Sequence, residues 1–410
     1  MKSGIGRPVE LITLLVLLLG GCALIQGPEQ GAGDGRSTEP DRELFVVHSL
    51  AETISSVELG SAGTLGSVRS DLQYRGAVPN HLLRVGEELI VTLSGQNELL
   101  RLDENSLKVV GRINHPAGSN PMETRHLGTA APLSELADGL LVTTHLLAGR
   151  VRIDDMHNRS GSEPPPWSYS VGRAPQPLLP LPGDNSGEVR LLVANTNFST
   201  DSSRTSPFGK ATLTAMVFGP SEADSPAGLE MSSTETIDLE PSDFDPSVES
   251  GTNPTALIDA PGVGEVLVIG SGLNYGAGGT GSDDGVVIAL DRNTLALQSR
   301  HAVGGSPGAG VLLTEGTGHR LYLGGPTGIT SLYHDGTEWI DDPRLEYEAT
   351  GSGGSLPFIA DIAYYDETIL AADFANNRIL AFGVADGGRL SLKQEVAVSQ
   401  GPIALLVDLE

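Results

Sequence analysis

The chain has 410 residues, with 25 basic and 52 acidic side chains and a formal net charge of −27. A charge of this sign repels nucleic acids and anionic membrane surfaces, so we expect no nucleic-acid partner. Its single cysteine, Cys22, excludes an internal disulfide and a cysteine-based metal site.

The first 21 residues have the organisation of a secretory signal peptide. Two positive charges, Lys2 and Arg7, precede an apolar run over residues 11–19. A run of this length rises only about 14 Å as a helix, whereas a hydrocarbon core is about 30 Å thick. We therefore predict a signal peptide over residues 1–21 rather than a permanent membrane span.

The end of this segment, Leu19-Gly20-Gly21-Cys22, resembles the lipobox of bacterial lipoproteins. Small residues before the cysteine let a protease reach the peptide bond, and the thiol accepts a diacylglycerol. The resemblance implies lipidation of Cys22; an ordinary signal peptide with an incidental cysteine is the alternative. By analogy with enterobacterial lipoproteins, Ala23 implies a cell-envelope protein sorted to the outer membrane. Residues 22–42 are then the lipidated cysteine and a flexible, Gly- and Pro-rich tether to the membrane.

Beyond the tether, a proline that introduces an apolar segment recurs seven times, at spacings from 42 (121 − 79) to 79 (254 − 175) residues. A second apolar segment follows each of the first six of these proline-led segments. Short segments rich in Val, Leu and Ile, separated by Gly, Asp and Asn, are typical of β-strands. No part of the chain after the signal sustains a helical apolar period. The prolines are Pro79, Pro121, Pro175, Pro254, Pro307, Pro357 and Pro402.

The two ends of this repeat are incomplete in complementary ways. The last proline-led segment, residues 401–410, is not followed by an apolar partner segment. Conversely, the apolar segment at residues 44–48 has no proline-led segment before it. Pairing the two completes a seventh unit and removes an open sheet edge. The sequence therefore predicts an all-β fold over residues 43–410, a seven-bladed β-propeller closed by pairing of the N- and C-terminal strands.

Three segments resemble known propeller repeats. Residues 99–113 resemble the YVTN repeat, residues 286–301 repeat that pattern, and residues 372–380 are similar to the NHL repeat. The resemblance implies the fold and no particular activity, since such propellers host many functions.

Two glycine-rich motifs have the letters of catalytic signatures but lie in the wrong context. Residues 304–308 have the spacing of a serine-hydrolase elbow, which needs a strand-to-helix turn, whereas here a β-strand should follow. Residues 276–281 have the letters of a dinucleotide fingerprint, but no helix is expected after them. We expect both to be loops, and we assign no catalytic residue.

The sequence also lacks a recognised metal-binding or cofactor-binding motif. Nine histidines are scattered along the chain, so whether any of them meet at a metal is left open. The segment 219–252 carries nine acidic and no basic side chains. Ca²⁺ bound near Asp243 and Asp245 is one interpretation, but the Asp-x-Asp-x-Asp-Gly loop is missing. The other interpretation is a solvated loop with an outer strand, and we expect no other cofactor.

A four-stranded antiparallel blade places the turn between its second and third strands on the same face as the proline-led loop into the next blade. Two of these turns are long, residues 195–210 and 271–285, and the acidic segment 219–252 enters the next blade on that face. Long loops on a rigid scaffold commonly carry binding residues; drift in loop length is the alternative. The candidate binding residues are Asp201, Arg204, Tyr275, Asp283 and Asp284.

Together these features favour a membrane-anchored lipoprotein, expected as a monomer. We expect it to act as a non-catalytic binding or scaffold propeller for a protein or glycan partner in the cell envelope. One alternative is a hydrolase similar to seven-bladed lactonases; another is an accessory subunit of a periplasmic redox system. Fold alone does not select among them.

The lipobox yields the first testable prediction. Cys22→Ser should abolish incorporation of labelled palmitate and move the protein from the membrane to the soluble fraction, because stable anchoring needs more than one acyl chain. Ser3→Ala, which leaves the lipobox intact, is the control. Equal label in Cys22→Ser and wild type would contradict the assignment.

Overall fold

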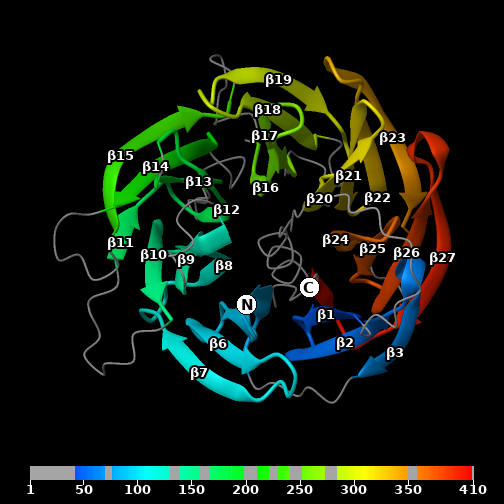
Figure 1. The fold of residues 1–410 in the computed structure, drawn as a ribbon, viewed down its shortest axis with the longest axis horizontal. Coiled ribbons are helices and arrows are strands. Elements are labelled where there is room, and N and C mark those ends of the chain that lie inside the picture. Colours follow the sequence, from blue (N-terminus) through cyan, green and yellow to red (C-terminus); the bar gives the residue numbers. More distant parts are fainter. Residues whose placement is uncertain are drawn as a thin grey trace, which may run out of the picture.

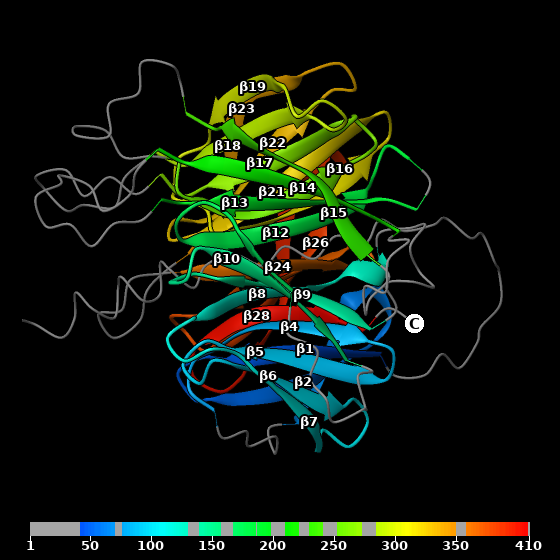
Figure 2. The same cartoon turned by 90° about the vertical axis from the view of Figure 1, so that its left-hand side faces the viewer.

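The computed structural model describes residues 42–69, 76–129, 139–156, 167–185, 187–197, 210–220, 229–240, 252–272, 284–349 and 358–408. These residues form seven four-stranded antiparallel sheets arranged as blades around one axis (Figure 1). The molecule is a seven-bladed β-propeller, as the sequence predicts. Seen from its edge in Figure 2, the strands run between the two faces of the ring. No helix among the described residues is long and apolar enough to cross a membrane.

Each blade runs from an inner strand beside the axis to an outer strand at the rim. Blades 1 to 3 consist of β28 (Pro402–Val407), β1 (Arg42–His48), β2 (Thr53–Leu59) and β3 (Leu65–Arg69); β4 (Pro79–Val85), β5 (Glu88–Leu93), β6 (Glu98–Asp103) and β7 (Val109–Asn114); and β8 (Pro121–His126), β9 (Leu140–His145), β10 (Arg150–Asp155) and β11 (Trp167–Ser170). Blades 4 and 5 consist of β12 (Pro175–Pro182), β13 (Val189–Asn195), β14 (Thr212–Pro220) and β15 (Leu229–Asp238); and β16 (Pro254–Ala260), β17 (Glu265–Gly270), β18 (Val286–Asp291) and β19 (Leu297–Ala302). Blades 6 and 7 consist of β20 (Ala309–Glu315), β21 (Gly318–Gly325), β22 (Gly328–His334) and β23 (Trp339–Glu348); and β24 (Ile359–Tyr365), β25 (Thr368–Asp373), β26 (Arg378–Val384) and β27 (Leu390–Ala397). Three short 3-10 helices are η1 (Ser61–Gly63), η2 (Leu127–Thr129) and η3 (Asp386–Gly388).

The core is distributed between neighbouring blades. Val46 of blade 1 and Leu370 of blade 7 belong to one buried cluster, and Val142 of blade 3 and Leu191 of blade 4 belong to another. The second strands are covered on both faces, so every residue of β9 and β13 is buried, whereas β7 at the rim is largely exposed. Burial of both faces explains why the second segments of the repeat are apolar runs rather than alternating patterns.

The ring closes as the sequence predicts. Strand β28 pairs antiparallel with β1, with Leu44 opposite Val407 and Val46 opposite Leu405. The last strand of the chain is therefore the inner strand of the blade that the N-terminal segment begins. No inner strand is left unpaired among the described residues.

In blades 1 to 6 the repeated proline follows a recurring turn at the entry to the inner strand; in blade 7 Ile359 takes the corresponding register position, and Pro357 lies outside the described residues. The preceding residue has a positive φ: 58° at Val78, 51° at Asn120 and 49° at Ala174. Its carbonyl accepts the N–H of the residue that follows the second strand of the same blade, as in Ser94 N to Val78 O at 3.1 Å. Proline suits the next position because its fixed φ and missing N–H leave no donor to satisfy there. We call the face that carries these turns the proline-led face.

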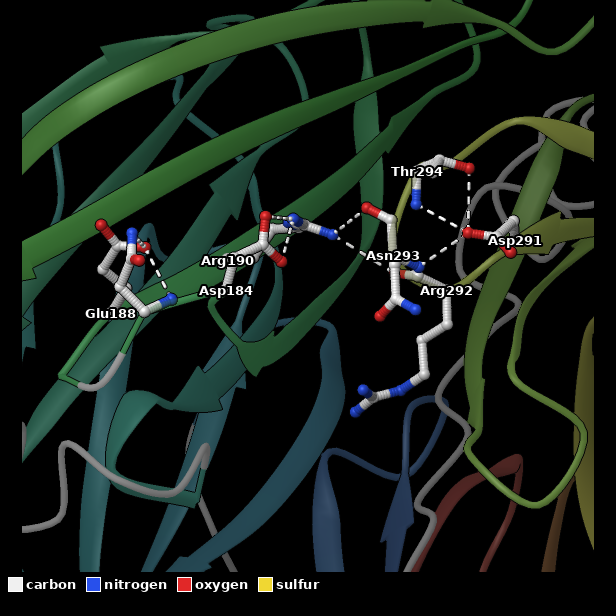
Figure 3. Close-up of polar contacts among 8 residues, drawn as sticks. Asp184, Glu188, Arg190, Asp291, Arg292, Asn293 and Thr294 are labelled. Atoms are coloured by element: carbon white, nitrogen blue, oxygen red, sulfur yellow. Dashed lines mark hydrogen bonds and ion pairs between the residues drawn. The ribbon is translucent and has the colours of Figure 1, made fainter.

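On the opposite face, polar groups of one blade bind a hairpin of the next. In Figure 3, Arg190 pairs with both carboxylate oxygens of Asp184 at 2.7 Å and donates to the carbonyls of Asn293, at 2.7 Å, and Arg292, at 3.3 Å. Asp291 shapes that hairpin by accepting the Thr294 N–H at 2.7 Å. Other blades use other donors for the same purpose: Arg101 to Met156 O at 3.1 Å, Tyr322 to Gly388 O at 2.8 Å, and Thr368 to Ala62 O at 2.8 Å.

The acidic segment 219–252 contains the outer strand β15, whose two ends lie on opposite faces. Only the end at Asp238 lies on the proline-led face, next in sequence to blade 5. In blade 3 long stretches of sequence also separate β8 from β9 and β10 from β11, and the strand ends that they join lie on the other face. Connection length alone thus does not select one face as the binding face.

Closure yields the second prediction. Deleting residues 400–410 should lower the thermal unfolding midpoint of the whole domain, because β1 loses its inner neighbour β28 and the blade gains an open edge. Circular dichroism measures the midpoint. Deletion of residues 409–410, which lie beyond β28, is the matched control. Equal midpoints for the long deletion and wild type would contradict the role of β28.

Candidate functional site

Polar side chains gather just after the proline position of several inner strands. Asn80 and Gln176 are one residue beyond their prolines, and His81 and Glu123 are two residues beyond. In blade 7, Ile359 pairs with Asp373 as Pro79 pairs with Leu93, so Asp361 is the equivalent of His81. Inner strands border the axis (Figure 1), which places these side chains near the proline-led end of the axis. With Arg125, they form what we call the axial cluster: Asn80, His81, Glu123, Arg125, Gln176 and Asp361.

The two carboxylates of the cluster join neighbouring blades. One oxygen of Asp361 accepts the Leu405 N–H at 2.8 Å and the other accepts the Ile362 N–H at 2.8 Å. Glu123 accepts the Leu178 N–H. Leu178 and Leu405 are both three residues beyond the proline of the following blade, so the same device is used twice. These hydrogen bonds give both carboxylates a structural role.

Arg125 supplies positive charge to the cluster. Its guanidinium lies 2.5 Å from Glu123 Oε1, and its Nε donates to the same oxygen at 2.6 Å. The charge of Arg125 also acts on His81 and on Asp361. Arg125 belongs to blade 3 and Asp361 to blade 7, which lie on opposite sides of the axis. The charge of Arg125 therefore acts across the axis.

Burial controls the protonation of these groups. It raises the pKa of Glu123 to about 7, against the opposing effects of Arg125 and the Leu178 N–H. It raises the pKa of Asp361 well above the usual range for a carboxyl group. Burial, assisted by the charge of Arg125, lowers the pKa of His81 well below its usual range. The imidazole of His81 is therefore neutral at physiological pH.

Several buried polar atoms of the cluster lack a hydrogen-bond partner within the described part of the chain. They are both ring nitrogens of His81, both polar atoms of the Gln176 amide, and the side-chain oxygen of Asn80. These three residues are 0%, 3% and 2% exposed, respectively. Leaving a buried polar group unsatisfied costs about 1–3 kcal/mol, so such groups are uncommon in folded proteins and call for an explanation.

A second buried polar group, between blades 2 and 3, is satisfied internally. His145 Nε2 lies 3.0 Å from His115 Nδ1, and His115 Nε2 lies 3.2 Å from Asp154, which also pairs with Arg152. Burial lowers the pKa of His145 to about 3. Among the described residues, no three or more His, Cys, Asp or Glu side chains are arranged to hold a metal ion.

Most residues singled out from the sequence lie outside the described residues: Cys22, Asp201, Arg204, Asp243, Asp245, Tyr275 and Asp283. Asp284 is described; it is half-buried and lies against Gly272, at the other end of the same turn. Sequence reasoning missed the axial cluster. The available signal was the polar residue directly after a repeated proline, as in Pro79-Asn80-His81 and Pro175-Gln176.

Comparison with known proteins supports the fold but identifies no function. No protein-family model matches the chain, and no curated protein matches it. A protein of Bacteroides fragilis provisionally described as a 6-phosphogluconolactonase superposes with a TM-score of 0.57 at 14% identity, covering 92% of this chain and 100% of its own. A Bacteroides uniformis protein with the same provisional description and a Lactobacillus plantarum protein each give 0.55 at 12% identity, covering 90% of this chain and 99% of their own. At these identities the likeness establishes the shared propeller fold alone.

The axial cluster yields the third prediction. Glutamate in an unfolded chain titrates near 4.5, and Glu123 titrates near 7 in the folded protein. Between these pH values only the folded state holds the proton, so the free energy of unfolding should fall as pH rises, by about 3 kcal/mol for this group. Glu123→Gln should remove that fall.

The measurement is urea unfolding of wild type and Glu123→Gln across pH 4–8. The difference between the two curves should slope between about pH 4.5 and 7 and be flat above. Glu235→Gln, at an exposed position of β15, is the control. Parallel curves for wild type and Glu123→Gln would show that Glu123 keeps an ordinary pKa.

Proposed function

We propose that this chain is a ligand-binding β-propeller and that its axial cluster holds a polar group of the ligand. The observation that carries the proposal is the set of buried, unpartnered atoms on His81, Gln176 and Asn80. A site built to hydrogen-bond a ligand must hold such atoms ready before the ligand arrives, at a cost to stability.

The chemistry of these groups supports binding rather than catalysis. Asp361 and Glu123 are engaged by backbone N–H groups of their own or the next blade, and Glu123 is also paired with Arg125. The groups left over are two amides and an imidazole of lowered pKa, which is a weak base. Amides and a neutral imidazole donate and accept hydrogen bonds without transferring charge.

The proposal places this propeller in the cell envelope. The lipobox at Cys22 and the tether over residues 22–42 support a lipid-anchored protein of the outer membrane, and the charge of −27 disfavours direct adhesion to anionic lipid. In this proposal the chain acts as a monomer, and its partner is a protein or glycan that offers a polar group to the proline-led face.

A second candidate function, a lactonase-like hydrolase, is favoured by one observation. Glu123 has a pKa of about 7 and lies beside Arg125, a combination suited to a general base next to a developing negative charge. Two proteins of the same fold carry a provisional lactonase description. Proton release from glucono-δ-lactone, faster with wild type than with Glu123→Gln, would favour this candidate; equal rates would remove it.

The fourth prediction tests the binding function. Gln176→Leu and His81→Leu should each raise the free energy of unfolding by about 1 kcal/mol, because a buried unsatisfied polar group is replaced by an apolar one. The same variants should lose capture of the partner from detergent-solubilised envelope. A gain in stability together with a loss of binding is the expected signature of a site held ready for a ligand.

Thr255→Val is the matched control, because Thr255 follows Pro254 as Gln176 follows Pro175, but its hydroxyl is satisfied by the carbonyls of Ile269 and Pro307. It should lose stability and keep binding. Undiminished capture by Gln176→Leu and His81→Leu would move the binding site elsewhere.

A further inference from the structure

We infer that a buried chain of three side chains, Asp154, His115 and His145, is an acid-sensitive latch between blades 2 and 3. His115 follows β7 of blade 2, whereas His145 ends β9 and Asp154 lies in β10 of blade 3. The latch is closed while the two imidazoles hold at most one proton beyond their neutral forms. It opens when acid supplies a second.

The hydrogen bonds of this chain fix the position of each proton. Burial opposes ionisation of Asp154, but its hydrogen bond to His115 and the charges of His115 and Arg152 outweigh burial and lower the pKa of Asp154. A carboxylate only accepts, so His115 Nε2, at 3.2 Å, carries a hydrogen. Neutral His115 then has its lone pair on Nδ1, and His145 Nε2–H donates to it across 3.0 Å.

This geometry accommodates one further proton and excludes two. A proton added to His115 occupies Nδ1, and His145 can still accept it on Nε2 by changing tautomer. A second proton places N–H groups on both facing nitrogens, which are 3.0 Å apart with no acceptor between them. Both rings then carry like charges in a buried setting, with their centroids 4.7 Å apart. The contact between the two histidines cannot persist in that state.

The surrounding charges also oppose the second proton. Arg152 donates to Asp154 Oδ1 at 2.7 Å and so already compensates that carboxylate. Burial and the charges of His115 and Arg152 lower the pKa of His145 to about 3, although Asp154 raises it. The other charged side chains on these strands are engaged elsewhere or point away: Glu98 pairs with Arg112, Arg101 with Glu88, Asp103 with Ser106 and Arg150 with Ser168, and Asp155 points to the other face of β10.

Acid sensitivity follows from the difference between the closed and the open latch. Once hydrated, His145 titrates near 6.5, whereas in the closed latch it titrates near 3. Between these pH values only the open state holds the proton, so stability of the closed state is lost as pH falls below 6.5. Each unit of pH should favour opening about tenfold.

The residue before His145 joins the latch to the axial cluster. The Thr144 hydroxyl donates to the Gln176 carbonyl at 2.9 Å and accepts the Glu123 N–H at 3.2 Å. Opening at the end of β9 therefore loosens the inner strands that carry Glu123 and Gln176.

The experiment is amide hydrogen exchange of the full-length chain, followed by mass spectrometry at pH 7 and pH 4 and corrected for intrinsic exchange rates. In wild type, opening over residues 139–156 should increase about hundredfold at pH 4. Residues 359–384 of blade 7, which contain no histidine, should change far less. His145→Gln, which keeps a donor at the position of Nε2 and cannot take up a proton, should lose most of the increase. His301→Gln, which places the same amide at a histidine Nε2 in blade 5, is the matched control and should keep it.

His115→Asn is the second variant. Its side-chain oxygen takes the place of Nδ1 and accepts the His145 N–H whether or not His145 is charged, so this variant should also lose the acid-induced increase. The same pH dependence over residues 139–156 in wild type and in both variants would overturn the latch. An increase of equal size in blade 7 of wild type would overturn its location between blades 2 and 3.

Discussion

The structure depends first on the pairing of β28 with β1 in blade 1. Of the seven described blades, this is the one whose strands come from both ends of the chain. A propeller blade is stable because its two faces pack against neighbouring blades, so one missing inner strand would uncover the interfaces on either side. The buried cluster that contains Val46 and Leu405 of blade 1 also contains Leu370 of blade 7, which shows how directly closure and packing are linked. Closure also fixes the Leu405 N–H where Asp361 accepts it, and so helps to set the geometry of the axis.

The turn before each inner strand links the repeat to the site. A residue of positive φ, a proline and a bulged pairing bring the chain from the rim of one blade to the axis of the next, as at Val78 and Pro79. The two positions after the proline, or after Ile359 in blade 7, are thereby presented at the proline-led end of the axis. Blades 1, 5 and 6 have small or apolar residues there, such as Ala256 and Ile403, whereas blades 2, 3, 4 and 7 carry the polar side chains of the axial cluster.

The polar residues of the axial cluster are of two kinds, according to whether the protein supplies their hydrogen-bond partners. Glu123 and Asp361 accept N–H groups from the next blade and so strengthen the ring, at the expense of burying ionisable groups. Asn80, His81 and Gln176 retain unpaired atoms that weaken the free protein. Arg125 pairs with Glu123 and so compensates a buried carboxylate of the cluster.

The sequence by itself determined the fold class, the number of blades and the closure, because a proline turn followed by two apolar segments is a local pattern that is written into each repeat. It could also indicate the outer strand within the acidic segment, found at β15. It could not show that Glu123 and Asp361 come close enough to influence each other, since 238 residues (361 − 123) separate them. Only the ring brings these positions together, and only the neighbouring blade decides which polar atoms are satisfied: Asp361 meets the Leu405 N–H, whereas His81 meets no partner among the described residues. Partners of this kind are set by register and by the identity of the adjoining blade, which no single repeat contains.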